Sequence, residues 1–287
     1  MEIWQAIVLG IVQGLTEFLP VSSSGHLVIF PWLFDWESGG LAFDAALHLG
    51  TLVAVIAYFS RDILRMLAAI PYALVNARSL LSRSAEDDEH PQSEARLGLL
   101  IVIATIPGLV AGLLLEGPID DFFHADEVSD RAIAVVATML IVVGIVLWLA
   151  ERAGERRMRI AGMRWPDAFT IGCAQALALI PGTSRSGATI TAGLFRGLKR
   201  ADAARFSVLA GMPLILGAGL KSVYDAVQEG MSRQELDLFL AGGISAAIVG
   251  FLTIFGLLRF LQTNSTTVFV IYRILFGLFL FAMIVFR

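Results

Sequence analysis

The chain has 287 residues, of which 57% are hydrophobic and only 16% charged, against about 25% charged in soluble domains. Several apolar runs are long enough to cross a bilayer, which takes roughly 20 residues, so an ordinary soluble domain is excluded. The single cysteine excludes an internal disulfide. The net charge of −4 identifies no partner, and no nucleic-acid-binding or dinucleotide-binding motif is present.

The first segment, 2–35, begins as an apolar helix and is interrupted near its middle by Pro20 and Ser22-Ser23-Ser24-Gly25. It has no basic start, so we do not interpret it as a signal peptide. Irregular backbone at membrane depth is tolerated only where protein or water satisfies its polar groups. We therefore expect a hairpin that enters the membrane and returns on the same side, with its loop lining a cavity.

Three full spans follow, then a second interrupted segment and three more spans. In order, we expect spans 43–59, 97–115 and 132–150, the hairpin 166–200, and spans 205–221, 238–258 and 267–286. An odd number of crossings after the first hairpin inverts the second half, 166–287, relative to the first, 1–150. The predicted fold is an all-α integral membrane protein with one transmembrane domain, 1–287. It is an inverted-topology repeat of six full transmembrane helices and two re-entrant helical hairpins.

Charge orients the predicted chain. The loops expected on one side, with Arg259, hold 15 of the 21 Lys and Arg residues; they are 61–96, 151–164 and 196–205. The loops 116–130 and 222–237, with the termini and their flanking residues, hold four. Cytoplasmic loops carry the excess of Lys and Arg, so we expect both termini outside.

The two interrupted segments repeat a set of residues. Gly10, Gln13, Ser22, Ser24 and Gly25 fall 162 positions before Gly172, Gln175, Ser184, Ser186 and Gly187. Arg185 stands at the position of Ser23. A repeated broken helix indicates two loops that meet at a buried polar site.

In the first segment, Gln13 and Glu17 are four residues apart and share one helix face. A carboxylate in a membrane segment usually faces a cavity and a partner. Glu17, with Gln13 as a second ligand, is therefore a candidate site for a divalent cation, since Mg²⁺ often binds one or two carboxylates plus substrate phosphates. The alternative is a Glu at a helix end that reaches interfacial water.

The run 22–26 places Ser22, Ser23 and Ser24 beside His26. A serine becomes a good nucleophile when a base accepts its proton, and His is a common base. The alternative is that these serines satisfy free backbone groups of the broken helix while His26 merely bonds a neighbour.

The second segment contains Pro181-Gly182-Thr183-Ser184-Arg185-Ser186-Gly187, with Thr189 following. Gly allows close backbone approach, Ser and Thr supply hydroxyls, and the Arg fork matches phosphate oxygens. A helix that begins near Gly187 adds free N–H groups directed at an anion. The string predicts a phosphate cradle without the spacing or the Lys of a Walker loop.

Three weaker candidates are Asp44, His48 and Arg273. Asp44 and His48 share a face at the outer end of the first full span and could guard an entrance, but two polar residues near an interface need no function. We expect Arg273 to extend to the cytoplasmic surface, with a buried carboxylate partner as the alternative.

The two strings together resemble the undecaprenyl-diphosphatase family of the bacitracin-resistance type. Its (E/Q)xxxE element corresponds to Gln13–Glu17, and its PGxSRSxxT element to Pro181–Thr189. The resemblance implies a re-entrant inverted-repeat fold, often dimeric, and hydrolysis of undecaprenyl diphosphate on the outer face of the bacterial cytoplasmic membrane. That reaction recycles the lipid carrier of peptidoglycan synthesis. Gln13 stands where many members have Glu, so this chain lacks the second carboxylate of a possible two-carboxylate metal site.

By this resemblance, Ser23 is the nucleophile, His26 the general base or acid, and Glu17 a ligand of Mg²⁺ (or of Ca²⁺) or a residue that orients His26. Arg185 stabilises the transferred phosphoryl group, and the remaining phosphate contacts come from Ser22, Ser24, Gly182, Thr183, Ser184, Ser186, Gly187 and Thr189. Direct attack by water is a rival route. The second function class is an inverted-repeat transporter or flippase for phosphate or lipid phosphate. The expected partners are the polyprenyl diphosphate, membrane lipids and a second copy of the chain, and no nucleic acid.

Overall fold

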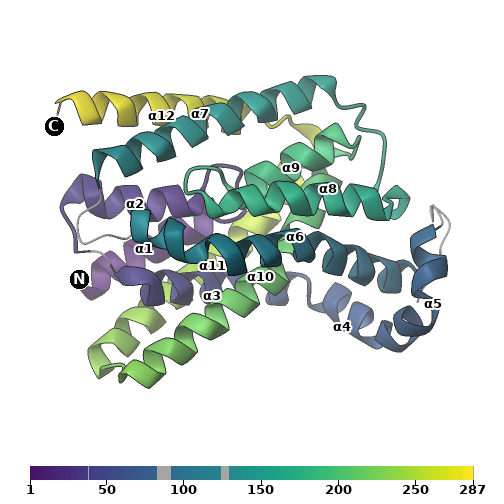
Figure 1. Cartoon of the computed structure of the whole chain (residues 1–287), viewed down its shortest axis with the longest axis horizontal. Coiled ribbons are helices and arrows are strands. Elements are labelled where there is room, and N and C mark those ends of the chain that lie inside the picture. Colours follow the sequence, from purple (N-terminus) through teal and green to yellow (C-terminus); the bar gives the residue numbers. More distant parts are fainter. Residues whose placement is uncertain (38, 83–91, 124–128, 287) are drawn as a thin grey trace.

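A computed structural model describes residues 1–37, 39–82, 92–123 and 129–286, and Figure 1 shows their arrangement. The described chain is built from α-helices and two short 3₁₀ helices, η1 and η2. In order they are α1 (Ile3–Thr16), α2 (Ser23–Phe34), α3 (Gly40–Tyr58), α4 (Ser60–Ala68), α5 (Ile70–Ser82), α6 (Gln92–Phe123), α7 (Asp130–Ala153), η1 (Ile160–Gly162), α8 (Trp165–Ala176), η2 (Leu177–Leu179), α9 (Arg185–Phe195), α10 (Arg200–Glu229), α11 (Arg233–Thr263) and α12 (Thr267–Phe286).

Six of these helices are long and apolar enough to span a membrane: α3, α6, α7, α10, α11 and α12. Each contains one of the six predicted spans to within a residue, so the all-α fold and the positions of the spans are confirmed. Only 22–44% of the residues in the most apolar window of each helix are buried within the chain. The outward faces are therefore apolar surfaces of the kind that lipid covers.

Three predicted loops are wrong in extent. Much of 61–96 is helical, because α4 and α5 occupy it, and the apolar residues of α4 recur at helical spacing. The region 222–237 is also largely helical, with a short turn between α10 and α11. Part of the predicted acidic loop 116–130 belongs to α6, and residues 124–128 lie outside the described part of the chain.

Close helix packing surrounds the two interrupted segments. Helix α1 packs on α11, which also packs on α3, while α8 packs on α6. Small residues permit these approaches. A Cβ on Gly10 would collide with the backbone of Gly242 in α11, and one on Gly172 would lie 2.9 Å from the Cα of Ala104 in α6. Glycine at the two repeat-related positions therefore sets how near these helices lie.

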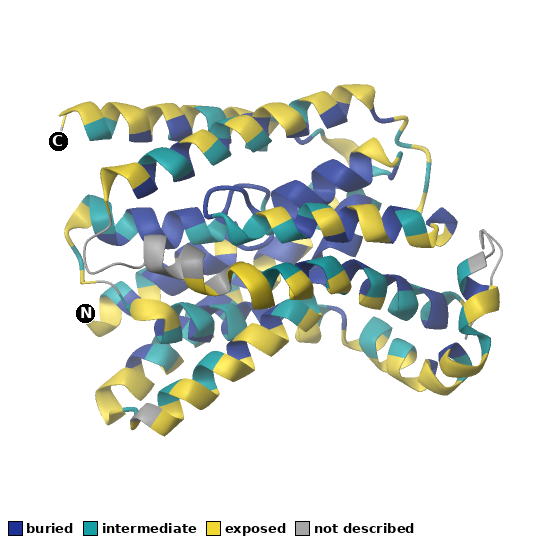
Figure 2. Cartoon of the chain, in the orientation of Figure 1, coloured by how far each residue is buried: buried dark blue, intermediate teal, exposed yellow. Residues whose placement is uncertain are grey.

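The two connecting loops, 17–22 and 180–184, lie inside this helical shell. Figure 2 shows buried residues gathered along α9 and the loops, while the outer faces of α7 and α12 are exposed. Phe18, Ile190 and Phe206 are fully buried around them. Apolar side chains thus exclude water from the backs of both loops.

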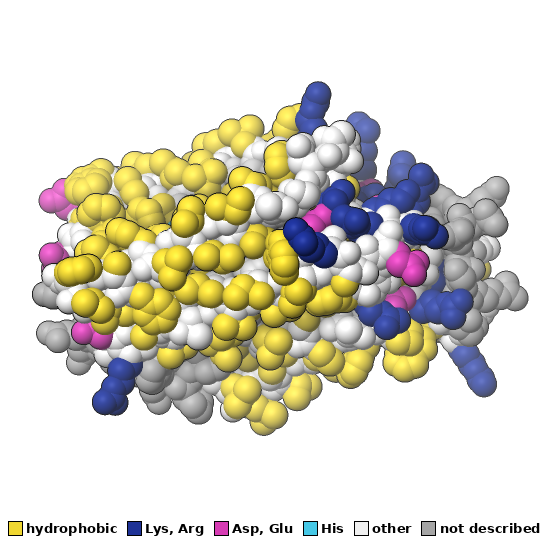
Figure 3. Space-filling model, turned by 90° about the horizontal axis from the view of Figure 1, so that it is seen from above, with side chains coloured by type: hydrophobic (Ala, Val, Ile, Leu, Met, Phe, Trp, Pro, Cys, Tyr) yellow, Lys and Arg dark blue, Asp and Glu magenta, His cyan; other side chains and the backbone are white. Residues whose placement is uncertain are grey.

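Charge divides the molecule into two ends. Lys and Arg side chains gather at one end (Figure 3), near the connection from α7 to α8 that carries Arg156, Arg157 and Arg159. The N-terminus and the end of α12 lie at the opposite end (Figure 1). This separation matches the charge pattern that the sequence predicts for the loops.

Candidate active site

Both loops end in the same local structure. Ser22 and Ser184 have φ angles of 77° and 70°, a region that costs a non-glycine residue about 1–3 kcal/mol. Each serine caps the helix that follows, since its Oγ accepts a hydrogen bond from the backbone N–H of Gly25 (3.3 Å) or Gly187 (3.0 Å). The repeated Ser-x-Ser-Gly pattern therefore fixes two matching helix starts, at α2 and α9.

The loops also bond directly to each other. The N–H of Gly182 donates to Ser22 Oγ at 3.1 Å, and Ser186 Oγ donates to the carbonyl of Leu19 at 2.8 Å. Gly182 has a φ of 91° and packs on Val136, where a Cβ would lie 2.8 Å from the Cα. The sequence prediction that the two segments meet is confirmed by these contacts.

Arg273 joins the loops from behind. Its side chain is fully buried, so the predicted extension to the surface is wrong. The guanidinium lies within hydrogen-bond distance of five carbonyl oxygens: Pro20 (3.0 Å), Met139 (3.1 Å), Leu140 (3.1 Å), Gly182 (2.9 Å) and Thr183 (3.0 Å). Irregular loops leave carbonyls without helical partners, and a buried arginine supplies the donors that water cannot supply at this depth.

Glu17 stands at the centre of the polar groups in front of the loops and is 4% exposed. Its Oε1 accepts from Arg185 Nη2 at 2.9 Å. Its Oε2 accepts from Ser23 Oγ at 2.7 Å and from Gln13 Nε2 at 3.0 Å. The predicted catalytic residues Glu17, Ser23 and Arg185 are thus in contact, although they come from opposite halves of the chain.

Arg185 is held in place by groups that the sequence did not single out. Its Nη1 donates to the carbonyl of Ser207 at 3.0 Å, and a side chain on Gly211 would collide with the guanidinium. Thr189 Oγ1 lies 2.6 Å from Ser207 Oγ. The available signal was the presence of Ser207 and Gly211 in an otherwise apolar span of α10.

His26 is placed differently from its predicted role. Its Nδ1 lies 2.6 Å from the carbonyl of Ser22, and its Nε2 lies 2.7 Å from Tyr272 Oη. The ring stacks on Phe276 with centroids 4.8 Å apart. Among the described residues it has no hydrogen bond to Ser23. Because a carbonyl only accepts, Nδ1 donates and Nε2 accepts from the tyrosine, so both ring nitrogens are occupied.

His48 lies beside Glu17 and lines the same cavity, a position that the sequence did not predict. Its Nε2 lies 3.5 Å from Glu17 Oε2. Glu17, Ser23, Ser24, Asp44, His48 and Arg185 line one cavity of about 330 Å³ together with apolar residues of α2, α3 and α10. Leu41 and Asp44 begin α3 and Ser222 lies late in α10, so the cavity lies toward the end of the molecule that holds the termini.

Of the predicted phosphate-binding residues, Ser24 lines this cavity. The others form the loops and the helix start behind it; they are Ser22, Gly182, Thr183, Ser184, Ser186, Gly187 and Thr189. The hydroxyls of Ser22, Ser184, Ser186 and Thr189 bond chiefly to backbone, which for Ser22 is the alternative that the sequence left open. The buried Thr183 Oγ1 has no hydrogen-bond partner among the described residues.

The residues around Glu17 are compatible with a divalent cation that takes most of its ligands elsewhere. The described residues contain no group of three or more His, Cys, Asp or Glu able to hold a metal. However, Gln13 Oε1 is buried without a partner, on the side chain that contacts Glu17. A rotated amide would place two protein oxygens together, and phosphate and water oxygens are the usual further ligands of Mg²⁺.

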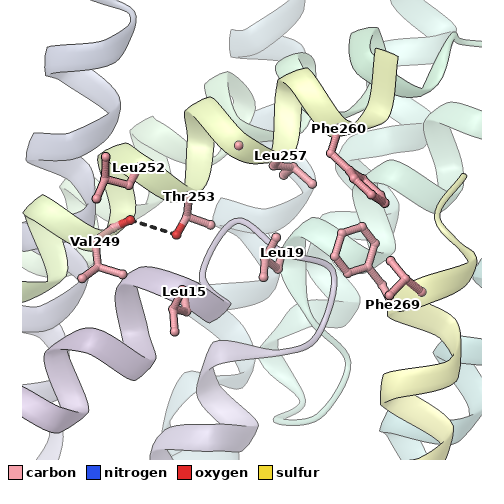
Figure 4. A pocket seen from close by; sticks show the side chains of 10 residues that line it. Leu15, Leu19, Val249, Leu252, Thr253, Leu257, Phe260 and Phe269 are labelled. Atoms are coloured by element: carbon pink, nitrogen blue, oxygen red, sulfur yellow. Dashed lines mark hydrogen bonds between the residues drawn. The ribbon is translucent and has the colours of Figure 1, made fainter. Parts of the chain in front are cut away.

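A second cleft, of about 490 Å³, lies on the other side of loop 17–22, between α1, α11 and the start of α12 (Figure 4). Its lining is almost entirely apolar and includes Leu15, Leu19 and Phe269. The hydroxyl of Thr253 donates to the carbonyl of Val249 at 2.8 Å and is therefore satisfied within its own helix. This cleft is lined by apolar groups, whereas the cavity beside Glu17 also holds charged side chains of both signs.

Comparison with known proteins agrees with the motifs. A family model described as bacitracin resistance protein BacA matches residues 6–279. An undecaprenyl-diphosphatase of Thermomicrobium roseum is 50% identical over 286 residues, which cover 100% of this chain and 99% of the relative. Undecaprenyl-diphosphatases of Desulforudis audaxviator and Synechococcus elongatus are 46% and 44% identical, over 97% and 96% of this chain and 96% and 91% of the relatives.

Replacing Arg273 with Met is expected to destabilise the fold by at least about 3 kcal/mol, because several buried carbonyls lose their donor and each costs about 1–3 kcal/mol. Thermal unfolding in detergent measures this as a large fall in Tm. Arg259→Met, at an exposed arginine of α11, is the matched control and should change stability by less than about 0.5 kcal/mol. Equal Tm values for the two variants would contradict the role given to Arg273.

Proposed function

Because the chain belongs to the bacitracin resistance protein BacA family, we propose that it is a membrane phosphatase that hydrolyses undecaprenyl diphosphate to undecaprenyl phosphate and inorganic phosphate. This reaction returns the lipid carrier to peptidoglycan synthesis and confers resistance to bacitracin. The names of the relatives supply the substrate. The structural observation that carries the proposal is the contact of Glu17 with both Ser23 and Arg185 in one cavity.

Arg185 is the group we assign to the phosphates. Its guanidinium has five N–H donors, of which one contacts Glu17 and another the Ser207 carbonyl. The remaining donors and the forked geometry suit phosphate oxygens. Phosphoryl transfer depends mainly on positioning and on stabilising the charge of the transferred group, so the fixed guanidinium supplies the main electrostatic contribution.

Ser23 is the proposed nucleophile. Its Oγ forms a bond to the terminal phosphorus, its proton moves to Glu17 Oε2, 2.7 Å away, and the bridging oxygen leaves with its electron pair as undecaprenyl phosphate. Water then cleaves the phosphoserine and releases inorganic phosphate. The geometry favours Glu17 over His26 as the proton acceptor. His26 instead ties the start of α2 to Tyr272. In the rival route, Glu17 activates water directly.

We also propose that a divalent cation, Mg²⁺ or Ca²⁺, takes part in the reaction. Glu17 and Gln13 would hold it, and when bound it would neutralise charge on the diphosphate.

We also propose that residues 1–150 and 166–287 are inverted repeats whose hairpins, 2–35 and 166–200, are re-entrant. Support comes from the matching caps at Ser22 and Ser184. The pairing of α1 with α11 and of α8 with α6 gives further support, since these pairs exchange under the repeat. The homodimer that the resemblance implies stays a prediction.

The protein is proposed to lie in the bacterial cytoplasmic membrane with its basic end in the cytoplasm and its termini and cavity facing outward. Figure 3 supports this through the segregation of Lys and Arg, because cytoplasmic loops carry the excess of positive charge. A transporter of phosphate or lipid phosphate is the alternative, but transport does not require the contact of a serine hydroxyl with a buried carboxylate.

Phosphate release from undecaprenyl diphosphate by the purified protein tests the function. Wild type should release phosphate, and Arg185→Ala should lower kcat/KM by about 100-fold or more, the usual effect of removing a donor to a developing charge. Arg259→Ala should behave as wild type. Undiminished phosphate release by Arg185→Ala would refute the role of Arg185 in binding the phosphates. Phosphate release that persists in the presence of a chelator would refute the role of the divalent cation.

A phosphoenzyme trap tests the covalent step. Acid quenching during turnover of substrate labelled at the terminal phosphate should leave label on Ser23, and Ser23→Ala should carry none. Repeated absence of label from an active wild-type protein would favour direct attack by water.

Orientation is tested by labelling single cysteines with a membrane-impermeant maleimide, after Cys173→Ser removes the native thiol. Gln234→Cys, at an exposed position in the first turn of α11, should react in intact spheroplasts. Arg157→Cys, at the basic end, should react only after lysis. The opposite pattern would invert the proposed topology.

A further inference from the structure

His48 is anchored so that one ring nitrogen faces the cavity. It lies one turn after Asp44 on α3, and its Nδ1 is 2.8 Å from the Asp44 carbonyl. Because a carbonyl only accepts, Nδ1 donates, which fixes the ring. Nε2 then points toward Glu17 Oε2, 3.5 Å away. This is the same oxygen that accepts from Ser23, so His48 approaches the reacting groups directly.

The two imidazoles near the loops differ in availability. His26 is 2% exposed, with both nitrogens within 2.7 Å of protein partners. The His48 side chain is 30% exposed and lines the cavity with Glu17 and Arg185. His48 therefore lines the same cavity as Ser23 and Arg185, the groups to which we assign the phosphate.

The charges around the cavity show what this nitrogen contributes. Apart from His48, the charged side chains that line it in the described chain are Glu17, Asp44 and Arg185, two carboxylates against one guanidinium. A diphosphate entering this cavity needs further donors to offset the carboxylates. His48 Nε2 is a ring nitrogen already aimed at that position.

We propose that His48 is a further active-site residue, which in its imidazolium form carries a proton on each ring nitrogen, so that Nδ1 donates to the Asp44 carbonyl while Nε2 donates to Glu17 and to an oxygen of the bound diphosphate. This inference rests on the proposed phosphatase function. The role is that of a hydrogen-bond donor. A glutamine, whose amide nitrogen reaches about the same point and which does not titrate, should therefore replace it, and a leucine of similar volume should not.

The test compares His48→Leu, His48→Gln and the matched control Val53→Leu, which lies on α3 with 57% exposure. Phosphate release gives kcat and KM for undecaprenyl diphosphate, thermal unfolding reports folding, and calorimetry measures binding of inorganic diphosphate. His48→Leu should lose about tenfold or more in kcat/KM, the usual effect of deleting a hydrogen bond to a charged group, and should bind diphosphate more weakly. His48→Gln should keep kcat/KM within about threefold of the wild-type value. Val53→Leu should have the wild-type kcat/KM.

Wild-type kcat/KM in a folded His48→Leu protein would overturn the inference. So would a His48→Gln protein impaired as severely as His48→Leu, since a donor alone would then be insufficient. A wild-type protein that releases no phosphate, yet binds inorganic diphosphate in a His48-dependent way, would refute the proposed hydrolysis and support the assignment of His48.

Discussion

The guanidinium of Arg273 is the group on which both motif loops depend. A chain that breaks its helices within a bilayer exposes carbonyl oxygens that neither helix nor water can satisfy. Here a single side chain from α12 reaches carbonyls of Pro20, Gly182 and Thr183, and also two on α7. The loops are therefore tied to each other and to the helices behind them. Within the part of the chain that the structure describes, the hydrogen-bond partners of Arg273 are all carbonyl oxygens, so its donors serve the backbone.

This arrangement divides the polar residues into two kinds. Ser22, Ser184 and Ser186 use their hydroxyls within the loops, where they cap helices and join the two halves. Glu17, Ser23 and Arg185 face the cavity. The strained φ angles of Ser22 and Ser184 turn the chain sharply at both places and bring α2 and α9 to the site. Most hydroxyls of the motif therefore stabilise the loops. The reaction is assigned to the three side chains that face the cavity.

The sequence alone predicted the six spans, because roughly 20 apolar residues in succession have one stable arrangement in a bilayer. It also predicted that the two motifs meet, because repeated polar loops at membrane depth need each other. It could not predict which side each hydroxyl faces, because that depends on loop conformations such as the positive φ of Ser184. For a related reason, the sequence could not predict which groups Arg273 and His48 contact. An isolated polar residue in a span has several possible hydrogen-bond partners. Only the packing of distant helices decides whether it contacts a loop carbonyl or Glu17.

In the proposed reaction, Ser23 from the first half of the chain and Arg185 from the second bind the same diphosphate. The most direct measurement is an experimental structure with a non-hydrolysable methylene-diphosphonate analogue of undecaprenyl diphosphate. We expect the terminal phosphonate to lie within hydrogen-bond distance of both Ser23 Oγ and the Arg185 guanidinium, in the cavity that Glu17 and His48 line. A head group bound away from either residue, with the Glu17–Arg185 contact intact, would contradict this assignment.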